Sequence, residues 1–298
     1  MTPVVASLPV RELLLGPVRD VRVLAVFPHA AYVEVVADVP SDAPPKLVTL
    51  VTADGVAHPN ALAVFDRHTD RPFRQLHQGQ AGCIGDGTLA LGDAVYRPAR
   101  WRSAVPSLPV TDPVRLAAAS VALHTHLEQR SGRLPADLVA PATIVAGGLV
   151  DGDVEVVRAT AAELIGCGPG LTPSGDDVLA GVLAGLRALS SAVGDARRLT
   201  ATLDAVGPDL VRQATGRTTG VSLALLDHAA RGEVAAPAGD LLHALAAHTP
   251  CTTGPATTDL GAATDRLLAV GSTSGRDLAI GLLAAADRLV HRGSLVPG

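Results

Sequence analysis

A glycine-rich phrase that ends in two aspartates is the stretch of this chain best suited to chemistry. It runs from Gly166 to Asp177 and reads Gly-Cys-Gly-Pro-Gly-Leu-Thr-Pro-Ser-Gly-Asp-Asp. Ser174 followed three residues later by Asp177 is typical of a helix start, where both side chains accept hydrogen bonds from free backbone amides. Such amides and the helix dipole attract anions, and glycines let a ligand approach the backbone. We therefore expect this phrase to bind a phosphate or carboxylate group.

The end of this phrase recurs 100 positions later (274 minus 174), where Ser274 matches Ser174. Residues 174–189 and 274–289 have 7 identities in 16 aligned positions, and we expect both serines to be N-caps of similar helices. Small residues follow at helical spacing, so the two helices can cross closely and bring both N-termini to one pocket. These stripes are Asp177, Gly181 and Ala184 in one helix and Asp277, Gly281 and Ala284 in the other.

Asp176 and Arg276 take the same position in the two copies and carry opposite charges. If Asp177 serves as a cap, Asp176 is free to orient a substrate amide, accept a proton or help to hold a cation. Replacing Asp176 or Arg276 with alanine should abolish ligand binding in isothermal titration and leave the fold intact. An ordinary capped turn between two helices is the alternative interpretation. The expected catalytic residues are Asp176, Asp177, Arg276 and Asp277.

A third polar stretch, residues 217–222, precedes another helical segment. It combines an arginine fork with three hydroxyls, which are groups that suit the binding of an oxyanion. An ordinary helix N-cap explains the same residues equally well. With the glycine phrase and its second copy, this stretch completes the expected substrate-binding set: Gly168, Gly170, Thr172, Ser174, Gly175, Arg217, Thr218, Thr219, Ser222, Ser272, Ser274 and Gly275.

Histidine, cysteine and lysine offer no further catalytic arrangement. His124 and His126 are two positions apart in a helical segment, so they point to different faces and suit a shared metal ion poorly. The three cysteines lack Cys-x-x-Cys spacing, and Cys167 is more simply a small loop residue than an activated thiol. Lys46 is the only lysine, which excludes a P-loop lysine. We expect no metal ion, no cofactor and no covalent intermediate.

Strand-like segments come first in the chain and helix-like segments follow. β-branched runs between turn residues predict strands at 21–27, 31–36, 47–51 and 89–96, with tight turns at 85–87 and 92–93. Asp112-Pro113 predicts a helix start, and we expect helical segments at 116–128, 159–165, 178–190, 196–206, 221–231, 239–247 and 276–291. This order indicates an α+β protein. We expect a β-rich N-terminal domain, 1–107, and a mainly helical domain, 108–298, that carries the anion site and the repeated helix start.

Composition and charge exclude several classes of protein. At 298 residues the chain is long enough for two domains, and its core must be aliphatic, because hydrophobic residues make up 48% and aromatic residues only 2%. A formal charge of −5, without basic residues interleaved with aromatics, argues against nucleic-acid binding. No apolar run reaches the ~20 residues that span a bilayer, and the N-terminus lacks a secretory pattern. We expect a cytoplasmic protein without a membrane segment.

On three of these segments the chain resembles the family of the AllH subunit of oxamate carbamoyltransferase. The segments are residues 168–181, 218–222 and 271–281, and with the β-rich start the resemblance covers most of the chain. It implies one subunit of a heteromeric enzyme of purine (allantoin) nitrogen catabolism, which interconverts oxalurate and phosphate with oxamate and carbamoyl phosphate. The chain departs from the family's pattern at Cys167 and at Ser272-Thr273, where a larger apolar residue and His-Ser are common. Neither a thiol nor a histidine is therefore expected to be essential there.

The resemblance implies a small anionic substrate, such as carbamoyl phosphate or oxamate, and partner subunits. In that chemistry Arg217 and Arg276 would neutralise charge, and Asp176 would orient the carbamoyl amide. The groups expected to hold phosphate or carboxylate are the hydroxyls of Thr172 and Ser174 and the amides of Gly175 and Asp176.

Two other functions fit the same residues. A non-catalytic subunit or ligand sensor would bind the same anion without turnover. A phosphotransferase would bind nucleotide and depend on Mg²⁺, and the lack of a lysine in any glycine-rich loop counts against it. The sequence leaves open the carbamoyl acceptor, the oligomeric state, whether this chain is catalytic alone, and whether a cation binds at Asp176 and Asp177.

Overall fold

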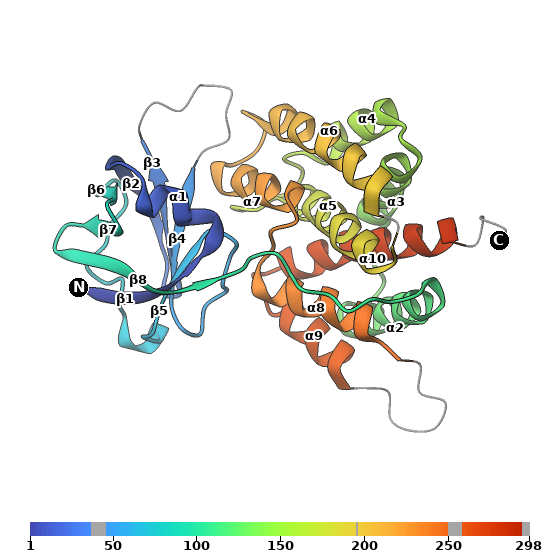
Figure 1. The fold of residues 1–298 in the computed structure, drawn as a ribbon, viewed down its shortest axis with the longest axis horizontal. Coiled ribbons are helices and arrows are strands. Elements are labelled where there is room, and N and C mark those ends of the chain that lie inside the picture. Colours follow the sequence, from blue (N-terminus) through green and yellow to red (C-terminus); the bar gives the residue numbers. More distant parts are fainter. Residues whose placement is uncertain (37–45, 195, 250–257, 294–298) are drawn as a thin grey trace. The chain divides into compact units, whose positions relative to one another are not determined.

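The computed structural model describes residues 1–36, 46–194, 196–249 and 258–293, so Cys251 lies outside the described residues. The chain divides into two compact units, Met1–Ala104 and Val105–Gly298, and each has a hydrophobic core of its own (Figure 1). Strands build the first unit and long helices build the second. The predicted α+β class is therefore confirmed.

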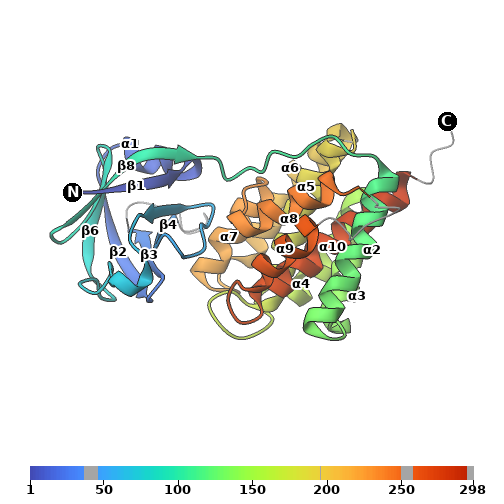
Figure 2. The ribbon, with the colours of Figure 1, turned by 90° about the horizontal axis from the view of Figure 1, so that it is seen from below.

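The strands of the first unit form a closed barrel in the order β1-β5-β4-β3-β2-β6-β7-β8. Neighbouring strands run antiparallel, except for the parallel pairs of β1 with β8 and β4 with β5. Figure 2 shows these strands from a second side. Their bounds are β1 Thr2–Ser7, β2 Arg19–Val26, β3 Ala30–Val35, β4 Leu47–Val51, β5 Ala61–Val64, β6 Ala81–Gly85, β7 Thr88–Leu91 and β8 Ala94–Arg102. Three short helices join them: η1 Leu8–Val10, α1 Arg11–Leu15 and η2 His68–Asp70.

Aliphatic side chains fill the barrel. Along β2 and β3, Val21, Val23, Ala31, Val33 and Val35 are buried, while the residues that alternate with them are partly or fully exposed. This alternation follows from the geometry of a strand, because successive side chains point to opposite faces. It places one face of each strand in the core that the composition predicted to be aliphatic.

Three of the four predicted strands, 21–27, 31–36 and 47–51, correspond to β2, β3 and β4. The prediction of one strand at 89–96 was wrong, because the predicted turn at Gly92 (φ 60°) divides this segment into β7 and β8. The turn at 85–87 is also confirmed, with Asp86 and Gly87 both at positive φ. Pattern reasoning missed β1, β5 and β6, which are short and contain proline, alanine or glycine.

The second unit consists of helices around a central one, α5. Every residue of α5 from Gly175 to Leu186 is buried, as expected for a helix that is nearly uncharged on all faces. The helix bounds are α2 Pro113–Ser131, α3 Ala136–Asp151, α4 Val154–Leu164, α5 Ser174–Ala192, α6 Ala196–Ala214, α7 Gly220–Ala230, α8 Ala236–Ala247, α9 Thr258–Leu268 and α10 Ser274–Gly293.

Helices α5 and α10 lie side by side and cross at their glycines (Figure 1). A Cβ atom added to Gly181 would lie 2.2 Å from the carbonyl oxygen of Leu278, and one added to Gly281 would lie 2.2 Å from that of Val178. Farther along, a Cβ on Gly185 would lie 2.7 Å from the Cβ of Ala285. The close crossing predicted from the small-residue stripes is confirmed, and it sets where both helices begin relative to each other.

Helix α2 begins as predicted, because the Asp112 side chain accepts a hydrogen bond from the amide of Arg115 and Pro113 is the first helical residue. Helices α3 and α9 were missed. Pro141 lies inside α3 and Gly147-Gly148 follow it, and these residues disfavour helix in isolation. Packing of α3 against α4, α5 and α10 overrides that preference.

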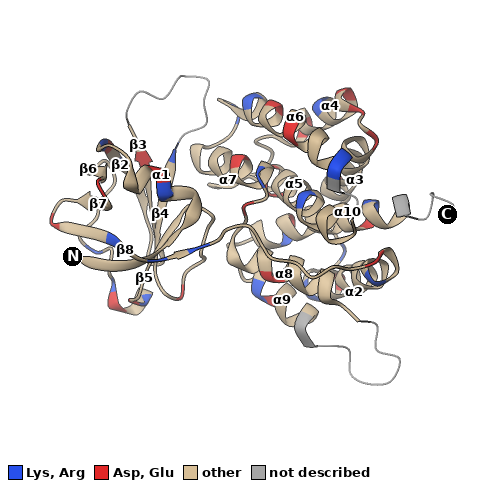
Figure 3. Ribbon diagram, in the orientation of Figure 1, with Lys and Arg blue, Asp and Glu red and all other residues tan. Residues whose placement is uncertain are grey.

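Charged residues of both signs are interspersed over many elements of the chain (Figure 3). Among the helices of the described residues, none combines the length and apolar character that crossing a membrane requires.

Candidate functional site

Helices α5 and α10 begin at Ser174 and Ser274, but these serines are not N-caps. The N-cap of α5 is Pro173, whose carbonyl accepts a hydrogen bond from the amide of Asp177 at 3.1 Å. In α10 the carbonyl of Thr273 accepts the equivalent bond from Asp277 at 2.9 Å. The prediction that Ser174 and Ser274 are the N-caps is therefore wrong, because each N-cap lies one residue earlier in the chain. Those side chains are left for other contacts.

The glycines of the phrase are required by close packing of the backbone. Gly166 and Gly168 have φ values of 74° and 111°, which strain any residue with a side chain. A Cβ on Gly166 would lie 2.3 Å from the carbonyl oxygen of Arg217, and one on Gly175 would lie 2.0 Å from that of Leu164. The loop between α4 and α5 thus packs directly on the segment before α7 and on the end of α4.

Some of the amides that were expected to bind an anion are already occupied. The amide of Gly175 donates to the carbonyl of Cys167 at 2.9 Å, and the amide of Asp176 donates to that of Pro173 at 3.0 Å. Among the described residues, the loop amides of Gly168, Gly170 and Thr172 have no protein acceptor. The free backbone donors of the phrase are therefore not those of Gly175 and Asp176.

The two helix starts meet through their hydroxyl groups. Thr172 Oγ1, which lies just before α5, is 2.8 Å from Ser274 Oγ, the first residue of α10. Both side chains are half-buried, so this contact lies below the surface but is not sealed from it. The predicted meeting of the two N-termini is confirmed, and the ligand pocket expected between them stays a prediction.

Asp177 lies beneath this hydroxyl pair and has an unusual acidity. The residue is only 9% exposed, and its Oδ2 has no hydrogen-bond partner. Burial raises the pKa of the Asp177 carboxyl to about 7, against the lowering effect of hydrogen bonds from Ser274 and Thr172. The nearby carboxylates of Asp277 and Asp176 raise this pKa further. Asp177 therefore changes its charge near neutral pH.

Asp176 is fully engaged rather than free, contrary to the expectation from the sequence. Its Oδ1 accepts a hydrogen bond from the amide of Gly166 at 2.9 Å, and its Oδ2 accepts bonds from the hydroxyls of Thr218 and Ser222, the latter at 2.8 Å. The residue is 2% exposed. A buried carboxylate with three donors stabilises the structure around it, so Asp176 ties the glycine loop to the start of α7.

Asp277 and Arg276 neutralise each other. Asp277 is completely buried, and its Oδ1 accepts bonds from Nε and Nη2 of Arg276 at 2.9 and 2.7 Å. The other oxygen, Oδ2, has no partner. The guanidinium was expected to face an anionic substrate; its Nε and one terminal nitrogen are instead committed to the neighbouring carboxylate.

The remaining expected substrate-binding residues lie around this centre. Thr219 is the N-cap of α7, because its hydroxyl accepts a bond from the amide of Ser222 at 3.0 Å. The exposed Arg217 donates to the carbonyl of Ala162 at 2.6 Å. Ser272 lies two residues before α10 and is exposed. Gly275 is the second residue of α10 and packs on the carbonyl of Leu267. Residues 217–222 were interpreted either as an oxyanion site or as an ordinary helix N-cap. The contacts of Thr219 are those of an N-cap.

The sequence of this region matches a known family. Residues 164–286 match the family described as oxamate carbamoyltransferase subunit AllH. We name these residues the AllH segment, which makes up less than half of the chain. The match supports the family that the three motifs indicated. No curated protein and no solved structure matches the chain.

The AllH segment contains every residue proposed for the site, from Gly168 to Asp277, and none of the barrel. The family name associates the segment with a carbamoyltransferase and, as a subunit, with partner chains. The AllH segment also includes α5 and most of α10, the helices whose crossing brings the site together.

Sequence reasoning missed two features of this site. The hydroxyl contact between Thr172 and Ser274 joins residues 102 positions apart, and it depends on how deeply the two glycine stripes interlock. The raised pKa of Asp177 depends on burial by surrounding helices. One sequence signal could have predicted the burial of Asp177. A helix that is apolar on all faces is buried on all sides, so a carboxylate in its first turn is buried with it.

Proposed function

We propose that this chain is a subunit of a carbamoyltransferase that interconverts oxalurate and phosphate with oxamate and carbamoyl phosphate in purine (allantoin) nitrogen catabolism. The AllH match over residues 164–286 supports a carbamoyltransferase subunit. The observation that carries the proposal is Asp177, a buried carboxyl with a pKa of about 7 that accepts hydrogen bonds from hydroxyls of both helix starts. Asp177 thus combines a carboxyl that titrates near neutral pH with the hydroxyls of Thr172 and Ser274, which lie nearer the surface.

The proposed reaction moves one proton between the substrates. An oxygen of hydrogen phosphate forms a bond with the carbamoyl carbon of oxalurate, and the bond from that carbon to the oxamate nitrogen breaks. The proton of hydrogen phosphate ends on that nitrogen. A carboxyl with a pKa near the working pH both accepts and donates a proton readily. We assign this exchange to Asp177, acting through the hydroxyls of Thr172 and Ser274 because its own oxygens are buried.

The loop before α5 is assigned to the anionic groups. The amides of Gly168, Gly170 and Thr172 lie at the N-terminal end of a helix, where the dipole favours negative charge. Such donors would also stabilise the oxyanion of the tetrahedral centre. Pairing of Arg276 with Asp277 removes one negative charge from the surroundings of the ligand. The proposed catalytic roles of Asp176, Arg276 and Asp277 become positioning roles in this scheme.

The proposal is tested by measuring carbamoyl phosphate formation from oxalurate and phosphate. The purified full chain is assayed alone and with candidate partner subunits. Turnover in either case supports the proposal, and comparing the two cases tells whether this chain is catalytic alone. The proposal fails if neither case gives turnover and the chain binds neither carbamoyl phosphate nor oxamate in isothermal titration.

Hydroxyl variants test the route of the proton. Thr172→Val and Ser274→Ala remove the two hydroxyls that contact Asp177, so we expect kcat to fall by about 10²-fold with a small change in KM. Thr143→Val is the matched control, because Thr143 is exposed in α3 and its hydroxyl donates only to the carbonyl of Val139 at 3.0 Å. Equal kcat values for Thr172→Val and the control would exclude the proposed route.

A non-catalytic anion-binding subunit is the second candidate. It is favoured by the hydrogen bonds of Asp176 and Arg276, which commit both expected catalytic side chains to the protein itself. Under this alternative the chain binds carbamoyl phosphate or oxamate, and turnover in the assembled enzyme is unaffected by Thr172→Val.

A further inference from the structure

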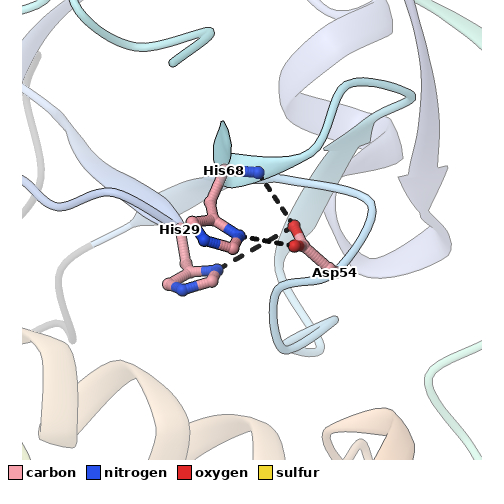
Figure 4. Close-up of side chains that lie close together, drawn as sticks. All are labelled: His29, Asp54 and His68. Carbon is pink, nitrogen blue, oxygen red and sulfur yellow. Dashed lines mark hydrogen bonds and ion pairs between the residues drawn. The ribbon is translucent and has the colours of Figure 1, made fainter. Parts of the chain in front are cut away.

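Two histidines and an aspartate converge outside the AllH segment, at one end of the barrel. His29 lies in the turn between β2 and β3, Asp54 in the loop between β4 and β5, and His68 in η2 after β5. Figure 4 shows both imidazole rings facing the carboxylate. One ligand atom of each residue lies within 4.8 Å of the others. Three separate loops therefore deliver two nitrogen donors and one oxygen donor to the same point.

The carboxylate of Asp54 is held between the two rings. His68 Nδ1 lies 2.6 Å from Asp54 Oδ2, and His29 Nδ1 lies 3.9 Å from Asp54 Oδ1. The amide of His68 donates to Oδ1 at 3.0 Å, which fixes the orientation of the carboxylate. These hydrogen bonds from His68 hold the pKa of Asp54 well below its usual range. The two imidazole rings lie 4.2 Å apart between centroids.

The loops themselves are fixed by backbone contacts. The amide of Thr52 donates to the carbonyl of His29 at 3.0 Å, and the amide of Ala53 donates to that of Asp66 at 2.8 Å. Gly55 is required there, because a Cβ at this position would lie 2.9 Å from the carbonyl oxygen of His29. The loop that carries Asp54 is thus tied to the segments that carry both histidines, so the backbones of these three residues are held close together.

We propose that His29, Asp54 and His68 bind a divalent transition-metal ion, of which Zn²⁺ is the representative. Two imidazoles and a carboxylate are a common ligand set of zinc, and three protein ligands leave a position for water or another molecule. Zinc ligands lie about 2.0–2.2 Å from the ion. The two imidazole side chains are 50% and 41% exposed, so their rings have room to rotate and close around it. This site is independent of the proposed carbamoyl transfer.

An ion pair between His68 and Asp54 alone would not require His29. His29 makes only the longer 3.9 Å approach to the carboxylate, so it contributes little to such a pair. A metal ion would depend on all three residues. The effect of replacing His29 therefore separates the two interpretations.

Zinc binding to the full chain tests the proposal. The metal-free chain is titrated with Zn²⁺ in competition with a chromophoric chelator, and we expect one tight site per chain. His29→Ala, His68→Ala and Asp54→Asn should each weaken binding by at least about 10-fold, since even the loss of an outer contact to a ligand costs about 10–100-fold. Co²⁺ provides a second probe, because its visible absorption reports the ligands directly and should be lost in His29→Ala.

His77→Ala is the matched control, because His77 is exposed in the same unit and belongs to no such cluster. It should bind Zn²⁺ as the wild type does. The proposal is overturned if the wild type binds no Zn²⁺, or if His29→Ala and His68→Ala bind it as tightly as His77→Ala. Far-UV circular dichroism of each variant, compared with the wild type, shows that lost binding does not come from unfolding.

Discussion

Asp176 and Asp177 are neighbours in the chain, but their carboxyl groups have different surroundings. Asp176 is surrounded by donors from Gly166, Thr218 and Ser222, whereas Asp177 has one oxygen without a partner and two carboxylates nearby. Full hydrogen bonding stabilises a charged carboxylate, and burial beside like charges destabilises it. Asp176 therefore ties the glycine loop to the start of α7, and Asp177 is the group to which we assign the proposed proton exchange.

The raised pKa of Asp177 predicts a loss of stability as pH rises. Below about pH 3 the carboxyl is protonated in both the folded and the unfolded chain. As pH rises through the ordinary value of 3.8 toward about 7, the unfolded chain loses this proton first, so the folded state becomes less stable; above pH 7 the loss is complete. Asp177→Asn removes this dependence. From pH 5 to pH 8, we expect the variant to gain about 2–3 kcal/mol over the wild type in the free energy of unfolding.

Urea denaturation at pH 5 and pH 8 measures this difference. Asp151→Asn is the control, because Asp151 is an exposed carboxylate that pairs with Arg288 on the surface. Its difference from the wild type should be the same at both pH values. A constant difference for Asp177→Asn as well would show that Asp177 ionises in the folded chain as it does in the unfolded one.

The Asp176→Ala test expected from the sequence is changed by the structure. Alanine would leave the Gly166 amide and two hydroxyls without their acceptor, and unsatisfied buried donors cost about 1–3 kcal/mol each. Loss of ligand binding in that variant would then report unfolding as much as a lost contact. Variants of Thr172 and Ser274 avoid this, because their side chains are only half-buried.

At the scale of elements, the crossing of α5 and α10 determines the site. Gly181 and Gly281 bring the helix backbones into contact one turn after Asp177 and Asp277. This depth of contact allows the Thr172 and Ser274 hydroxyls to meet at 2.8 Å. Larger residues at the crossing would separate the first turns and with them the groups around Asp177.

Substitution at the crossing tests this dependence. Gly181→Ala places a Cβ 2.2 Å from the carbonyl oxygen of Leu278, so we expect a destabilisation of about 1–3 kcal/mol or more in urea unfolding. Gly147→Ala is the matched control in α3, where the nearest atom to the new Cβ, on Arg288, lies 3.9 Å away. It should stabilise the chain by about 0.5–1 kcal/mol, because alanine favours helix over glycine. Similar stabilities for the two variants would mean that the helices do not approach as closely as described.

At the scale of the whole molecule, each of the two units has its own hydrophobic core. The core of the first unit is formed by residues between Val4 and Tyr96, and that of the second by residues between Leu116 and Leu289. The AllH segment and its site lie in the second unit, and the proposed metal site lies in the first. Each site is therefore assembled from residues that share one core.

Separate expression tests whether the units are independent domains. Because the barrel closes on itself and the helices bury their own core, we expect fragments 1–104 and 105–298 each to unfold cooperatively in thermal scans by circular dichroism. Fragment 1–60 is the control, since it lacks β5, the neighbour of both β1 and β4, and it should not fold. Non-cooperative unfolding of fragment 105–298 would show that the helical unit needs the barrel for stability.

Local signals in the chain were sufficient for much of the helical site. The starts of α5 and α10, and their contact at Gly181 and Gly281, could be predicted because small residues at i and i+4 lie on one helix face whatever surrounds the helix. Asp112 likewise predicted the start of α2. The positions of the N-caps were missed by one residue, since the carbonyls of Pro173 and Thr273 accept hydrogen bonds from the amides of Asp177 and Asp277, which the serines were expected to cap.

Contacts between distant segments decided the rest. The barrel's closure joins β1 to β8, and the meeting of His29, Asp54 and His68 follows from strand register, which no single segment specifies. The same is true of the acidity of Asp177, which is set by how much water the neighbouring helices exclude. Residue types and spacing therefore determined where helices begin and which faces can touch. Only the folded chain decided which polar atoms remain unpaired, because burial and hydrogen bonding depend on every element that packs around them.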